Sequence, residues 1–523
     1  MKHSLLLAGL FVLCLCASAQ THVTFSDIED WTIEELQPYV GQEIIFDQPV
    51  YICNNYNGLK ASMHRQWSPT NQAIPMSAQY DIIVSQNSHN TFTLSGLSGN
   101  QRMGQLIFGM RAKIESKGQV KYLSSDRITG TREDLESGIP NVDLVYDEDG
   151  DSIVTHDLLV CGANLEYYLV EQFDASSSMG PSSSSEHQKQ RTKVSTALAK
   201  INADLYGLVE IQQGQNALKE IAEDLTRKTG RPFDYIRDGS SANGTYTKSG
   251  YVYCTDVLRP HGEIRENNAG VSNRKKMQAF DVIASGERFI YSINHFKAKS
   301  GSGSGKDADQ HDGQGGFNAT RVKESQSVLA AYSSNRSYFG DDDILIMGDL
   351  NAYAKEDPIV ALINGGMTDL HRQFHADSSY SYQYHGQFGY LDHALCNNSM
   401  LTQVTGMAAY HVNSDESDNY TYDKSSDATM FRYSDHDPVL VGLKLGASIS
   451  QGTEEELSAK NWKELLQSAA SGYYTVHTLD GRTFTSGTIS GENTEIALPT
   501  TDIYIISIYT GGKVYSFKCF ETF

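Results

Sequence analysis

One predicted strand limits the possible fold and function of this chain more than any other feature, because of the residues that follow it. The run ILIMGDLNAYAKEDP, residues 344–358, begins with four apolar residues and continues through Gly348 to Asp349 and Asn351. Four apolar residues in a row predict a strand that is buried on both faces. A period of two places Asp349 and Asn351 on the same side of the extending chain. Binding and catalytic residues concentrate in loops at strand ends, so this pair predicts a functional site.

The region around this strand alternates predicted strands with predicted helices. Five residues keep a helical spacing of three or four, namely Val194, Ala197, Leu198, Ile201 and Leu205. The run LYGLVEI then predicts a strand, and further strands are predicted at FIYSINHF, DILIMGDL, YLDHALC and PVLVGLKL. This alternation predicts an α/β domain over residues 153–447.

Polar residues stand at or near the ends of several of these strands. They are Asn164, Glu210, Asn294, His295, Asp349, Asn351, Asp392, Asp435 and His436. Any one of them alone is more often a turn former or a helix cap. Together they need one explanation, because two like charges about 4 Å apart cost about 4 kcal/mol at an effective dielectric of about 20. A divalent cation would hold such carboxylates, and ligands of the Asp, Glu and Asn type suit Mg²⁺, Mn²⁺ or Ca²⁺ rather than zinc.

The overall charge limits the partners that the surface can bind. The chain has 42 Lys and Arg residues against 64 Asp and Glu residues, which gives a formal net charge of -22. An acidic surface argues against a protein that coats nucleic acid non-specifically, because such a protein would be basic. It does not exclude an enzyme that meets phosphate through a bound cation, because the cation inverts the local electrostatics.

The length of the chain and its first residues predict several domains and export. With 523 residues the chain is too long for one ordinary core. Residues 1–19 have a basic start, a short apolar run and a small-residue pattern before Gln20. They predict a signal peptide that is cleaved near Ala19, and therefore a secreted or cell-surface protein. No stretch reaches the length of a membrane span, so we expect no stable membrane insertion.

Two further β regions are predicted to flank the α/β domain. Residues 20–152 alternate short strand-like runs with turn residues and predict a small β domain, for which an OB-like barrel is our expectation. Residues 448–471 predict a helix-like connector, and residues 472–523 predict a small β sandwich. The run DIYIISIYTGGKVYSFKCF in this tail is similar to the C-terminal sorting modules of Bacteroidetes-type secretion, and an ordinary β module is the alternative.

The remaining candidate ligands favour structural roles. Five cysteines follow the signal peptide, and their odd number and lack of CxxC spacing predict neither a disulfide framework nor a zinc site. Cys161 and Cys396 stand in apolar runs and are predicted to fill the core. His393 is predicted to be a packing residue, while Asp415 and Glu416 predict either a structural cation site or no ligand.

The order of the motifs in the middle region resembles a known superfamily. The chain contains, in this order, Asn164, Glu210, Arg274, Asn294-His295, Gly348-Asp349-Leu350-Asn351, Asp392 and Ser434-Asp435-His436. This series resembles the DNase I-like endonuclease/exonuclease/phosphatase superfamily. The runs NHFKAK, DGQGGFNATRV and SDHDPVLVGL resemble its branch of secreted bacterial extracellular nucleases. The resemblance covers about residues 155–445 and implies a four-layer α/β/β/α sandwich with its site at one end of two facing sheets.

The resemblance implies a metal site. Glu210 would be the principal metal ligand, with Asn164, Asp349, Asn351 and Asp435 around the metal and the nucleophile. Asn351 would also donate a hydrogen bond to the substrate. The metal would be Mg²⁺ or Mn²⁺, with Ca²⁺ as an alternative.

The resemblance also implies the groups that move protons and bind phosphate. Asp392 would orient His436, and that pair would activate water or hold the scissile phosphate. His295 would act on the leaving group or stabilise the charge that develops. Arg274 would reach a phosphate, and Asn294 would donate to the substrate. These roles are chemically coherent, because phosphodiester hydrolysis needs a positioned water, a base and neutralisation of charge on the phosphate.

Three positions depart from the superfamily pattern. Val209 stands where a Gln usually precedes the strand-end Glu, and Phe317 stands where a Trp is often found, although Phe317 could still stack on a base. The acidic partner that often orients the first His would fall near residues 248–250, where none is acidic. The sequence therefore leaves open whether His295 is a general acid or mainly a phosphate donor.

The predicted function is phosphodiester hydrolysis outside the cell. We expect a divalent-metal-dependent endonuclease whose substrate is DNA or RNA. A phosphatase or a sphingomyelinase-type phospholipase is the alternative, because this superfamily also hydrolyses phosphoesters of lipids and inositols. A non-catalytic surface protein is a further alternative, against which the intact GDLN and SDH motifs argue. The sequence leaves the oligomeric state open.

Overall fold

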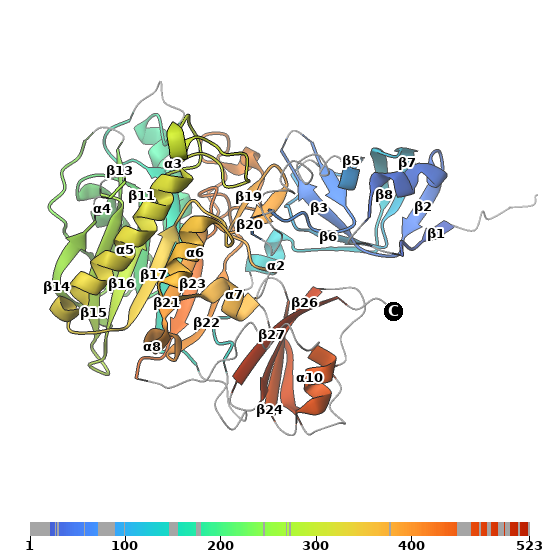
Figure 1. Cartoon of the computed structure of the whole chain (residues 1–523). Coiled ribbons are helices and arrows are strands. Elements are labelled where there is room, and N and C mark those ends of the chain that lie inside the picture. The colour runs from blue at the N-terminus through green and yellow to red at the C-terminus, as the bar shows by residue number, and fades with distance from the viewer. Residues whose placement is uncertain are drawn as a thin grey trace, which may run out of the picture.

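The computed structural model describes most of the chain between residues 21 and 446, and parts of the C-terminal region (Figure 1). The described residues are 21–446 without 27, 29–30, 57, 69, 72–88, 99, 137, 146–154, 174–178, 244–245, 268, 271–272 and 376–377, together with 462–469, 472–478, 483–489, 496, 503–510 and 513–520. The predicted signal peptide and most of the predicted connector lie outside these residues. Within them, every helix is too short or too polar to cross a bilayer.

Two six-stranded sheets form the centre of the molecule. The first has the order β12 (Phe233–Tyr235), β13 (Thr247–Cys254), β11 (Leu205–Gln212), β10 (Leu158–Tyr168), β23 (Val439–Leu443) and β22 (Val404–Ala409). The second has the order β14 (Leu258–Glu266), β15 (Lys275–Val282), β16 (Arg288–Asn294), β17 (Ile344–Asp349), β21 (Asp392–Asn397) and β18 (Met367–Asp369). The strands predicted from LYGLVEI, FIYSINHF, DILIMGDL, YLDHALC and PVLVGLKL are β11, β16, β17, β21 and β23.

The two sheets face each other across a shared apolar core, and helices cover their outer faces. Residues of both sheets, among them Val209 and Met347, pack together in the core between them. Helices α3 (Ser184–Ile201) and α4 (Asn216–Thr229) pack on the outer face of the first sheet, and α5 (Asn318–Phe339) and α6 (Asp357–Asn364) on that of the second (Figure 1). The predicted four-layer α/β/β/α sandwich is therefore confirmed.

Local signals set the ends of α3. The Ser183 side chain accepts a hydrogen bond from the Glu186 amide at the N-terminus, and Asn202 ends the helix in the left-handed conformation with φ 53°. The helix therefore ends before Leu205, which the predicted helical spacing had included, and Leu205 is the first residue of β11. The prediction that Leu205 continues the helical face is wrong, since an αL residue at 202 turns the chain into the sheet.

The buried cysteines fill the core as predicted. Cys161 on β10 and Cys396 on β21 are fully buried and free. Cys161 packs under the helices α3 and α4, and Cys396 packs between the two sheets. Burial raises the pKa of both thiols above their usual range, which favours the neutral form and fits a packing role.

Shorter elements connect the layers of the sandwich. They are α7 (Leu370–His375), the hairpin of β19 (Tyr382–Tyr384) and β20 (Gln387–Gly389), α8 (Asn398–Leu401), η2 (Gly305–Asp307) and η4 (Asp418–Tyr420). The β19–β20 hairpin lies where the sandwich meets the N-terminal sheet (Figure 1).

The N-terminal region forms a nine-stranded sheet with its own apolar core. Its order is β1 (Thr21–Val23), β2 (Glu43–Phe46), β7 (Arg111–Ser116), β8 (Gln119–Ser124), β5 (Phe92–Ser95), β4 (Lys60–Ser62), β3 (Val50–Asn54), β6 (Leu106–Phe108) and β9 (Arg127–Thr129). The helix η1 (Ile33–Tyr39) packs on this core through Leu36, and α2 (Arg132–Glu136) follows the sheet. The β character of this region agrees with the sequence, while the OB-like barrel stays a prediction.

The C-terminal region forms a four-stranded antiparallel sheet. Its order is β25 (Thr483–Ile489), β24 (Gly472–Thr478), β26 (Ile503–Thr510) and β27 (Lys513–Phe520). Helix α10 (Trp462–Ser468) packs on one face of the sheet, where Leu465 and Leu466 meet Val476 and Ile506. The sorting role of this region stays a prediction.

A buried arginine ties the N-terminal region to the sandwich. Arg102 forms ion pairs with Asp415 at 3.4 Å and with Glu416 at 2.5 Å, and its side chain is 5% exposed. Glu416 also pairs with Arg132 at 2.6 Å, and the Asn55 side chain donates to the Asp415 carbonyl at 3.0 Å. For Asp415 and Glu416 the sequence left open a structural cation site or no ligand. In the structure both carboxylates pair with guanidinium groups.

Replacing Arg102 with methionine is expected to destabilise the protein by about 3–5 kcal/mol, because it leaves a buried carboxylate without its countercharge. Urea denaturation measures this change. The control is Arg111→Met, which breaks a pair with Glu43 at 2.6 Å between side chains that are 40% and 49% exposed. We expect that loss to cost less than about 1 kcal/mol. Equal midpoints for the two variants would contradict the expectation.

Candidate active site

The glycine that ends the apolar run of β17 is required by a close backbone approach. Gly348 has φ 123°, and a Cβ at this position would lie 2.0 Å from the Asn294 carbonyl oxygen at the end of β16. A side chain at position 348 would therefore push the two strands apart. The glycine lets β16 and β17 end side by side, which brings His295 and Asp349 to the same sheet end.

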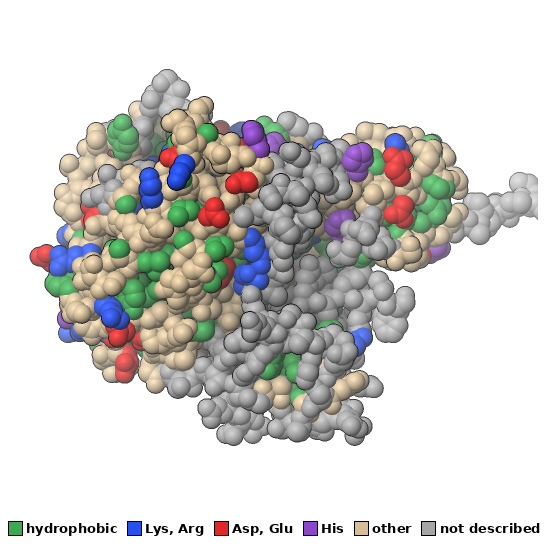
Figure 2. Space-filling model, in the orientation of Figure 1, with side chains coloured by type: hydrophobic (Ala, Val, Ile, Leu, Met, Phe, Trp, Pro, Cys, Tyr) green, Lys and Arg blue, Asp and Glu red, His purple; other side chains and the backbone are tan. Residues whose placement is uncertain are grey.

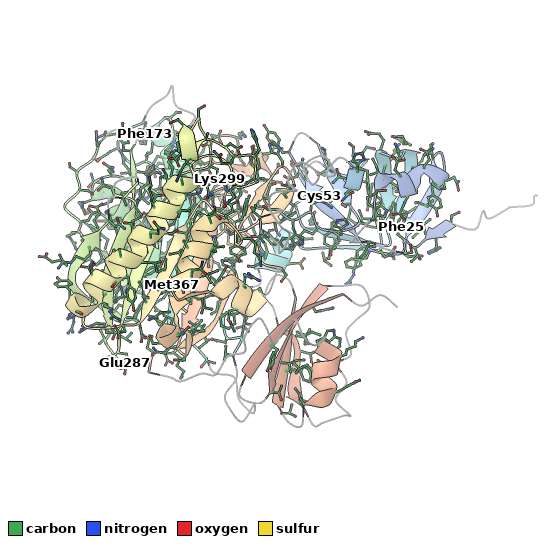
Figure 3. All side chains as sticks on the ribbon, viewed as in Figure 1. Phe25, Cys53, Phe173, Glu287, Lys299 and Met367 are labelled. Carbon is green, nitrogen blue, oxygen red and sulfur yellow. The ribbon has the colours of Figure 1, made fainter. Side chains whose placement is uncertain are left out.

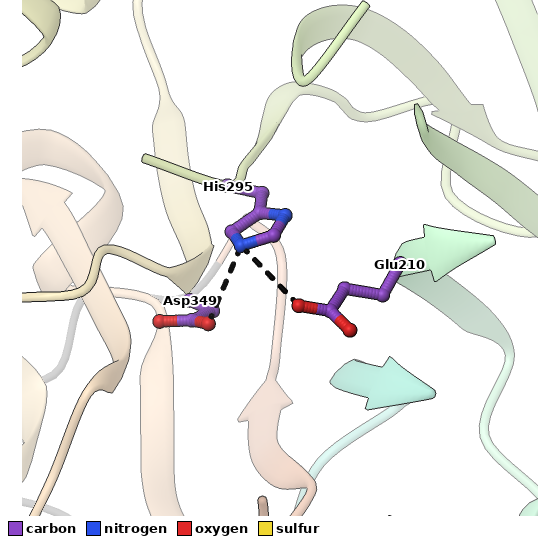
Figure 4. Close-up of side chains that lie close together, drawn as sticks. All are labelled: Glu210, His295 and Asp349. Atoms are coloured by element: carbon purple, nitrogen blue, oxygen red, sulfur yellow. Dashed lines mark ion pairs between the residues drawn. The ribbon is translucent and has the colours of Figure 1, made fainter. Parts of the chain in front are cut away.

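Three side chains from both sheets meet at this end (Figure 4). The His295 Nε2 atom lies 3.5 Å from Glu210 Oε1 and 3.6 Å from Asp349 Oδ2. Glu210 comes from β11 in the first sheet, while Asp349 and His295 come from the ends of β17 and β16 in the second. Asn164, near the end of β10, donates from Nδ2 to Asp349 Oδ2 at 3.2 Å. The strand ends therefore converge as the sequence predicted.

A second histidine approaches the same oxygen of Asp349. The His436 Nδ1 atom lies 2.7 Å from Asp392 Oδ2, and its Nε2 atom lies 3.9 Å from Asp349 Oδ2. Asp392 and Asp349 are register partners of β21 and β17, which explains why their carboxylates share one place. Ser381 Oγ donates to Asp392 Oδ2 at 2.7 Å and fixes that carboxylate. Asp435 completes this side, with Oδ2 3.9 Å from His436 Nε2.

Several residues of the site have positive φ angles, which are rare for residues other than glycine. Glu210, Asn351 and Glu166 have φ values of 57°, 49° and 49°. The register of β10 with β11 shifts between Asn164 and Tyr168, so a bulge turns the side chains at this end. Such conformations cost about 1–3 kcal/mol each and persist where surrounding structure fixes them, often at functional sites.

The acidic residues of the site hold their protons more tightly than usual. Burial first, and then repulsion by Asp435 and Asp349, raises the pKa of Glu210 to about 7. Burial also raises the pKa of Asp349 to about 7, with His436 opposing the shift. Glu166, from β10, has a pKa raised to about 8 by burial and by Asp435. These carboxylates crowd a buried space in which extra positive charge is favourable.

The two histidines are shifted in opposite directions. Burial lowers the pKa of His295 well below its usual value, and the positive charge of Arg274 adds to this shift. Burial alone would also lower the pKa of His436, but the carboxylates of Asp392 and Asp349 outweigh it and raise the pKa well above the usual value. The imidazole that is paired with Asp392 is therefore the one whose charged form the site favours.

The donor set fits a hard divalent cation. Glu210, His295 and Asp349 each offer one atom, and these atoms lie within 4.8 Å of one another. The Glu166 Oε2 atom is buried without a hydrogen-bond partner among the described residues, although it lies in the same acidic space. A buried carboxylate oxygen without a partner is costly unless a cation or a donor satisfies it. Oxygen atoms dominate the set, which suits Mg²⁺ or Mn²⁺.

The other predicted site residues lie at the margin or outside. Asn351 lies beside Asp349, because its backbone N–H donates to Asp349 Oδ1 at 2.9 Å. Arg274 reaches the edge, where Nη2 donates to Thr247 at 3.3 Å. Asn294 is fully buried and donates to the Ser292 carbonyl at 3.1 Å, within the sheet. The structure therefore does not bring the Asn294 side chain to the site, and its substrate role stays a prediction.

The positions that depart from the superfamily pattern also have clear surroundings. Val209 is fully buried between the sheets, and the Phe317 ring lies 4.3 Å from Lys297 Nζ. Lys248 is buried and pairs with Asp238 at 2.8 Å. His295 Nδ1 has no hydrogen-bond partner within the part of the chain that the structure describes, in line with the absence of an acidic residue at 248–250.

Sequence reasoning missed three residues of the site. Glu166 stands two positions after Asn164, and this polar-Leu-polar pattern repeats Asp349-Leu350-Asn351, so the signal was present in the chain. Ser381 and Tyr382 carried no comparable signal. Tyr382 lies against His436 with ring centroids 4.6 Å apart, a contact between residues that are remote in the sequence.

Comparison with known proteins shows that the middle of the chain is similar to one protein family. Residues 178–436 match the model of the Endonuclease/Exonuclease/phosphatase family. A search of curated proteins gave no match. Similar solved structures include an endonuclease/exonuclease/phosphatase from Bacteroides vulgatus, with 13% identity, a TM-score of 0.37, and coverage of 55% of this chain and 98% of that one.

Two further solved structures have the same TM-score. The Bacteroides thetaiotaomicron mannosyl-6-phosphatase has 18% identity, a TM-score of 0.37, and coverage of 55% of this chain and 100% of that one. D. rerio TDP2 in complex with a single-strand DNA product has 14% identity, a TM-score of 0.37, and coverage of 55% and 98%.

Proposed function

We propose that this enzyme is a secreted, metal-dependent endonuclease acting on DNA. The proposal starts from the match of residues 178–436 to the model of the Endonuclease/Exonuclease/phosphatase family, whose members hydrolyse phosphoester bonds. The observation that supports it most is the meeting of Glu210, Asp349 and His295 with the Asp392–His436 pair at one sheet end. This arrangement offers a base, a phosphate contact and a cation site within a few ångströms, as phosphodiester hydrolysis requires.

In this proposal each residue has a role that follows from its contacts. Asp392 holds the Nδ1–H of His436, so that Nε2 faces the site. In its charged form, which the surrounding carboxylates favour, the ring would donate to the scissile phosphate, and in its neutral form Nε2 would take the proton of the attacking water. Glu210 and Asp349, with Asn164 and Asp435 beside them, would hold Mg²⁺ or Mn²⁺. A bound divalent cation would neutralise charge on the phosphate oxygens.

The remaining polar groups would contact the phosphate and the leaving group. His295 Nε2 points into the site, and burial favours its neutral form, so it would donate a hydrogen bond to the phosphate. Arg274 would contact a phosphate oxygen, and Asn351 would donate to the substrate. A phosphatase or a sphingomyelinase-type phospholipase would use the same groups, so the polynucleotide substrate rests on the sequence runs shared with extracellular nucleases.

One side-by-side assay tests the substrate. The purified protein is offered circular DNA, RNA and sphingomyelin, each with Mg²⁺, with Mn²⁺ or with a chelator. We expect nicking and then linearisation of circular DNA with either metal and none with chelator. Clearance of sphingomyelin without any cutting of DNA or RNA would overturn the proposal. The variant Asp392→Asn is the matched negative control, because it keeps the side-chain volume but no longer favours the same His436 tautomer.

The location outside the cell is tested separately. We expect the protein in the culture medium or at the surface of the cell that produces it, with a mature N-terminus near Gln20. Fractionation followed by N-terminal sequencing checks both points, and a full-length chain retained inside the cell would contradict them.

A further inference from the structure

Tyrosines alternate along the segment that passes the proposed base. The sequence SYSYQYHG contains Tyr380, Tyr382 and Tyr384 at every second position. Tyr380 is buried and stacks on His411 with ring centroids 3.8 Å apart. Tyr382 is partly buried, with its ring beside His436, and Tyr384 is 57% exposed. Aromatic rings therefore run from the core, past the reacting histidine and out to solvent.

The strand that carries these rings is held firmly at both ends. At its start, Ser381 Oγ donates to Asp392, and the Asp437 N–H donates to the Ser381 carbonyl at 2.8 Å. At its tip, His385 and Gly386 have φ values of 51° and 81°, which is the two-residue turn that favours a tight hairpin. The rings are thus presented on a short hairpin whose start is hydrogen-bonded to the catalytic carboxylate.

The opposite face of the hairpin is packed against the N-terminal region. Phe388 is fully buried and lies beside Trp67, with ring centroids 6.4 Å apart. A Cβ on Gly386 would lie 2.7 Å from the carbonyl oxygen of Cys53, which Figure 3 labels at the end of the N-terminal sheet nearest the sandwich. One face of the hairpin is therefore covered, and the face that carries Tyr382 and Tyr384 is the one beside the site.

Charge gives a reason for a polynucleotide to need such rings. The chain has a formal net charge of -22. On the face of the sandwich seen in Figure 2, Lys and Arg side chains are scattered among acidic ones and form no stripe. Affinity for nucleic acid usually comes from neutralised phosphates, and an acidic protein has little of this contribution. Stacking of bases on aromatic rings is a source of affinity that net negative charge does not remove.

We propose that Tyr382 and Tyr384 form a stacking platform for the bases of a single-stranded segment beside the scissile phosphate. This proposal rests on the proposed nuclease function and adds how the strand is held. Side chains two positions apart on a strand are about 6.6 Å apart, so adjacent unstacked bases can each meet one ring. The first ring lies at His436, which places the platform next to the reacting phosphate.

A lipid surface is the other occupant that an exposed aromatic hairpin could have. The tip of this hairpin carries His385 and Gln387, which are polar, and its glycine is pressed against the Cys53 carbonyl. A hairpin that is packed in this way cannot extend its tip into a bilayer without leaving the N-terminal sheet. The observations therefore favour nucleobases.

The test compares one ring-deleting variant on substrates with and without bases. Wild type, Tyr384→Ala and Tyr384→Phe are assayed on a short oligothymidylate, on the same oligomer with abasic sites around the scissile bond, and on bis(4-nitrophenyl) phosphate. We expect Tyr384→Ala to raise KM for the oligothymidylate roughly tenfold and to leave the other two substrates unchanged. Tyr384→Phe should behave like wild type, because stacking needs the ring and not the hydroxyl.

The controls separate the platform from the proposed function. Tyr338, which is 42% exposed near the end of α5, provides the matched variant Tyr338→Ala, for which we expect no change on any substrate. Equal effects of Tyr384→Ala on the thymidylate and abasic oligomers would overturn the platform while leaving the nuclease intact. Hydrolysis of bis(4-nitrophenyl) phosphate by a wild type that cuts no polynucleotide would overturn both. Weaker binding of Tyr384→Ala to sphingomyelin vesicles, with unchanged oligomer kinetics, would assign the rings to lipid.

Discussion

Changing His436 to alanine is expected to lower kcat on DNA by about 10³-fold or more while the protein stays folded. The imidazole is the group in the site whose Nδ1 is fixed by a carboxylate, at 2.7 Å from Asp392, and whose Nε2 faces the acidic centre. A positioned general base contributes about 10²–10⁴-fold to such reactions. The measurement is turnover at saturating substrate and metal, with circular dichroism to check the fold.

A second histidine serves as the matched control for this experiment. His261 on β14 lies 3.5 Å from Asp281 with a side chain that is 36% exposed, so His261→Ala removes an imidazole away from the site. We expect that variant to keep wild-type turnover. If His436→Ala retained nearly full activity, the water would have to be activated by another group, and the assignment of the base would be wrong.

The variant Glu210→Gln is expected to lose activity by about 10²-fold or more and to lose metal binding with it. It removes one negative charge from the proposed metal ligand, whose carboxylate accepts a hydrogen bond from the Tyr167 N–H at 3.2 Å and lies 3.5 Å from His295 Nε2. Weaker binding should appear in calorimetric titration with Mn²⁺ and in a lost rise of Tm when metal is added, since a ligand stabilises only the state that binds it.

The same variant should change the pH dependence of the metal-free protein. Burial raises the pKa of Glu210 to about 7, above the value of about 4.3 expected in an unfolded chain. The folded state therefore binds the extra proton between these values, and stability falls as pH rises from about 4 to about 7. Glu210→Gln should flatten part of this fall and raise Tm near pH 8 without metal.

An exposed glutamate gives the comparison for both readouts. Glu223 on α4 pairs loosely with Lys219 at 3.8 Å, and its side chain is 64% exposed. Glu223→Gln should leave metal binding, activity and the pH profile unchanged. Identical metal titrations of Glu210→Gln and wild type would exclude Glu210 as a ligand.

The strands and their polar end residues could be predicted from the sequence because they depend on local patterns, whereas the four-layer sandwich was implied by the resemblance to the superfamily. The apolar run before Gly348 predicts a buried strand, and Glu210 and Asp349 each stand at or near the end of a strand. Parallel neighbours then place these ends together, as β10 and β11 or β16 and β17 do. The meeting of Glu210 with Asp349 joins two different sheets, so no local pattern carried it, and it was expected only from the resemblance to the superfamily.

Other parts of the site depend on information that no local pattern carries. The positive φ of Glu166 comes from a bulge in β10, which is visible only when the strand is paired with β11. The Asn294 side chain turns into the sheet to donate to Ser292, although its place at a strand end suggested the site. The contact of Tyr382 with His436 joins a short hairpin to a loop, and neither has a periodic signature.

The buried pairing of Arg102 has a practical consequence for anyone who dissects this enzyme. The segment that holds Asp415 also holds the loop of His436, because the Asn413 side chain donates to the His436 carbonyl at 2.6 Å. A fragment that starts at residue 153 would contain every proposed catalytic residue. It would lack Arg102, whose guanidinium pairs with Asp415 in the segment next to the His436 loop. The catalytic region therefore depends on the N-terminal region for its stability, although the two look like separate domains along the chain. An inactive fragment that lacks residues 1–152 would say little about the chemistry of the full-length protein.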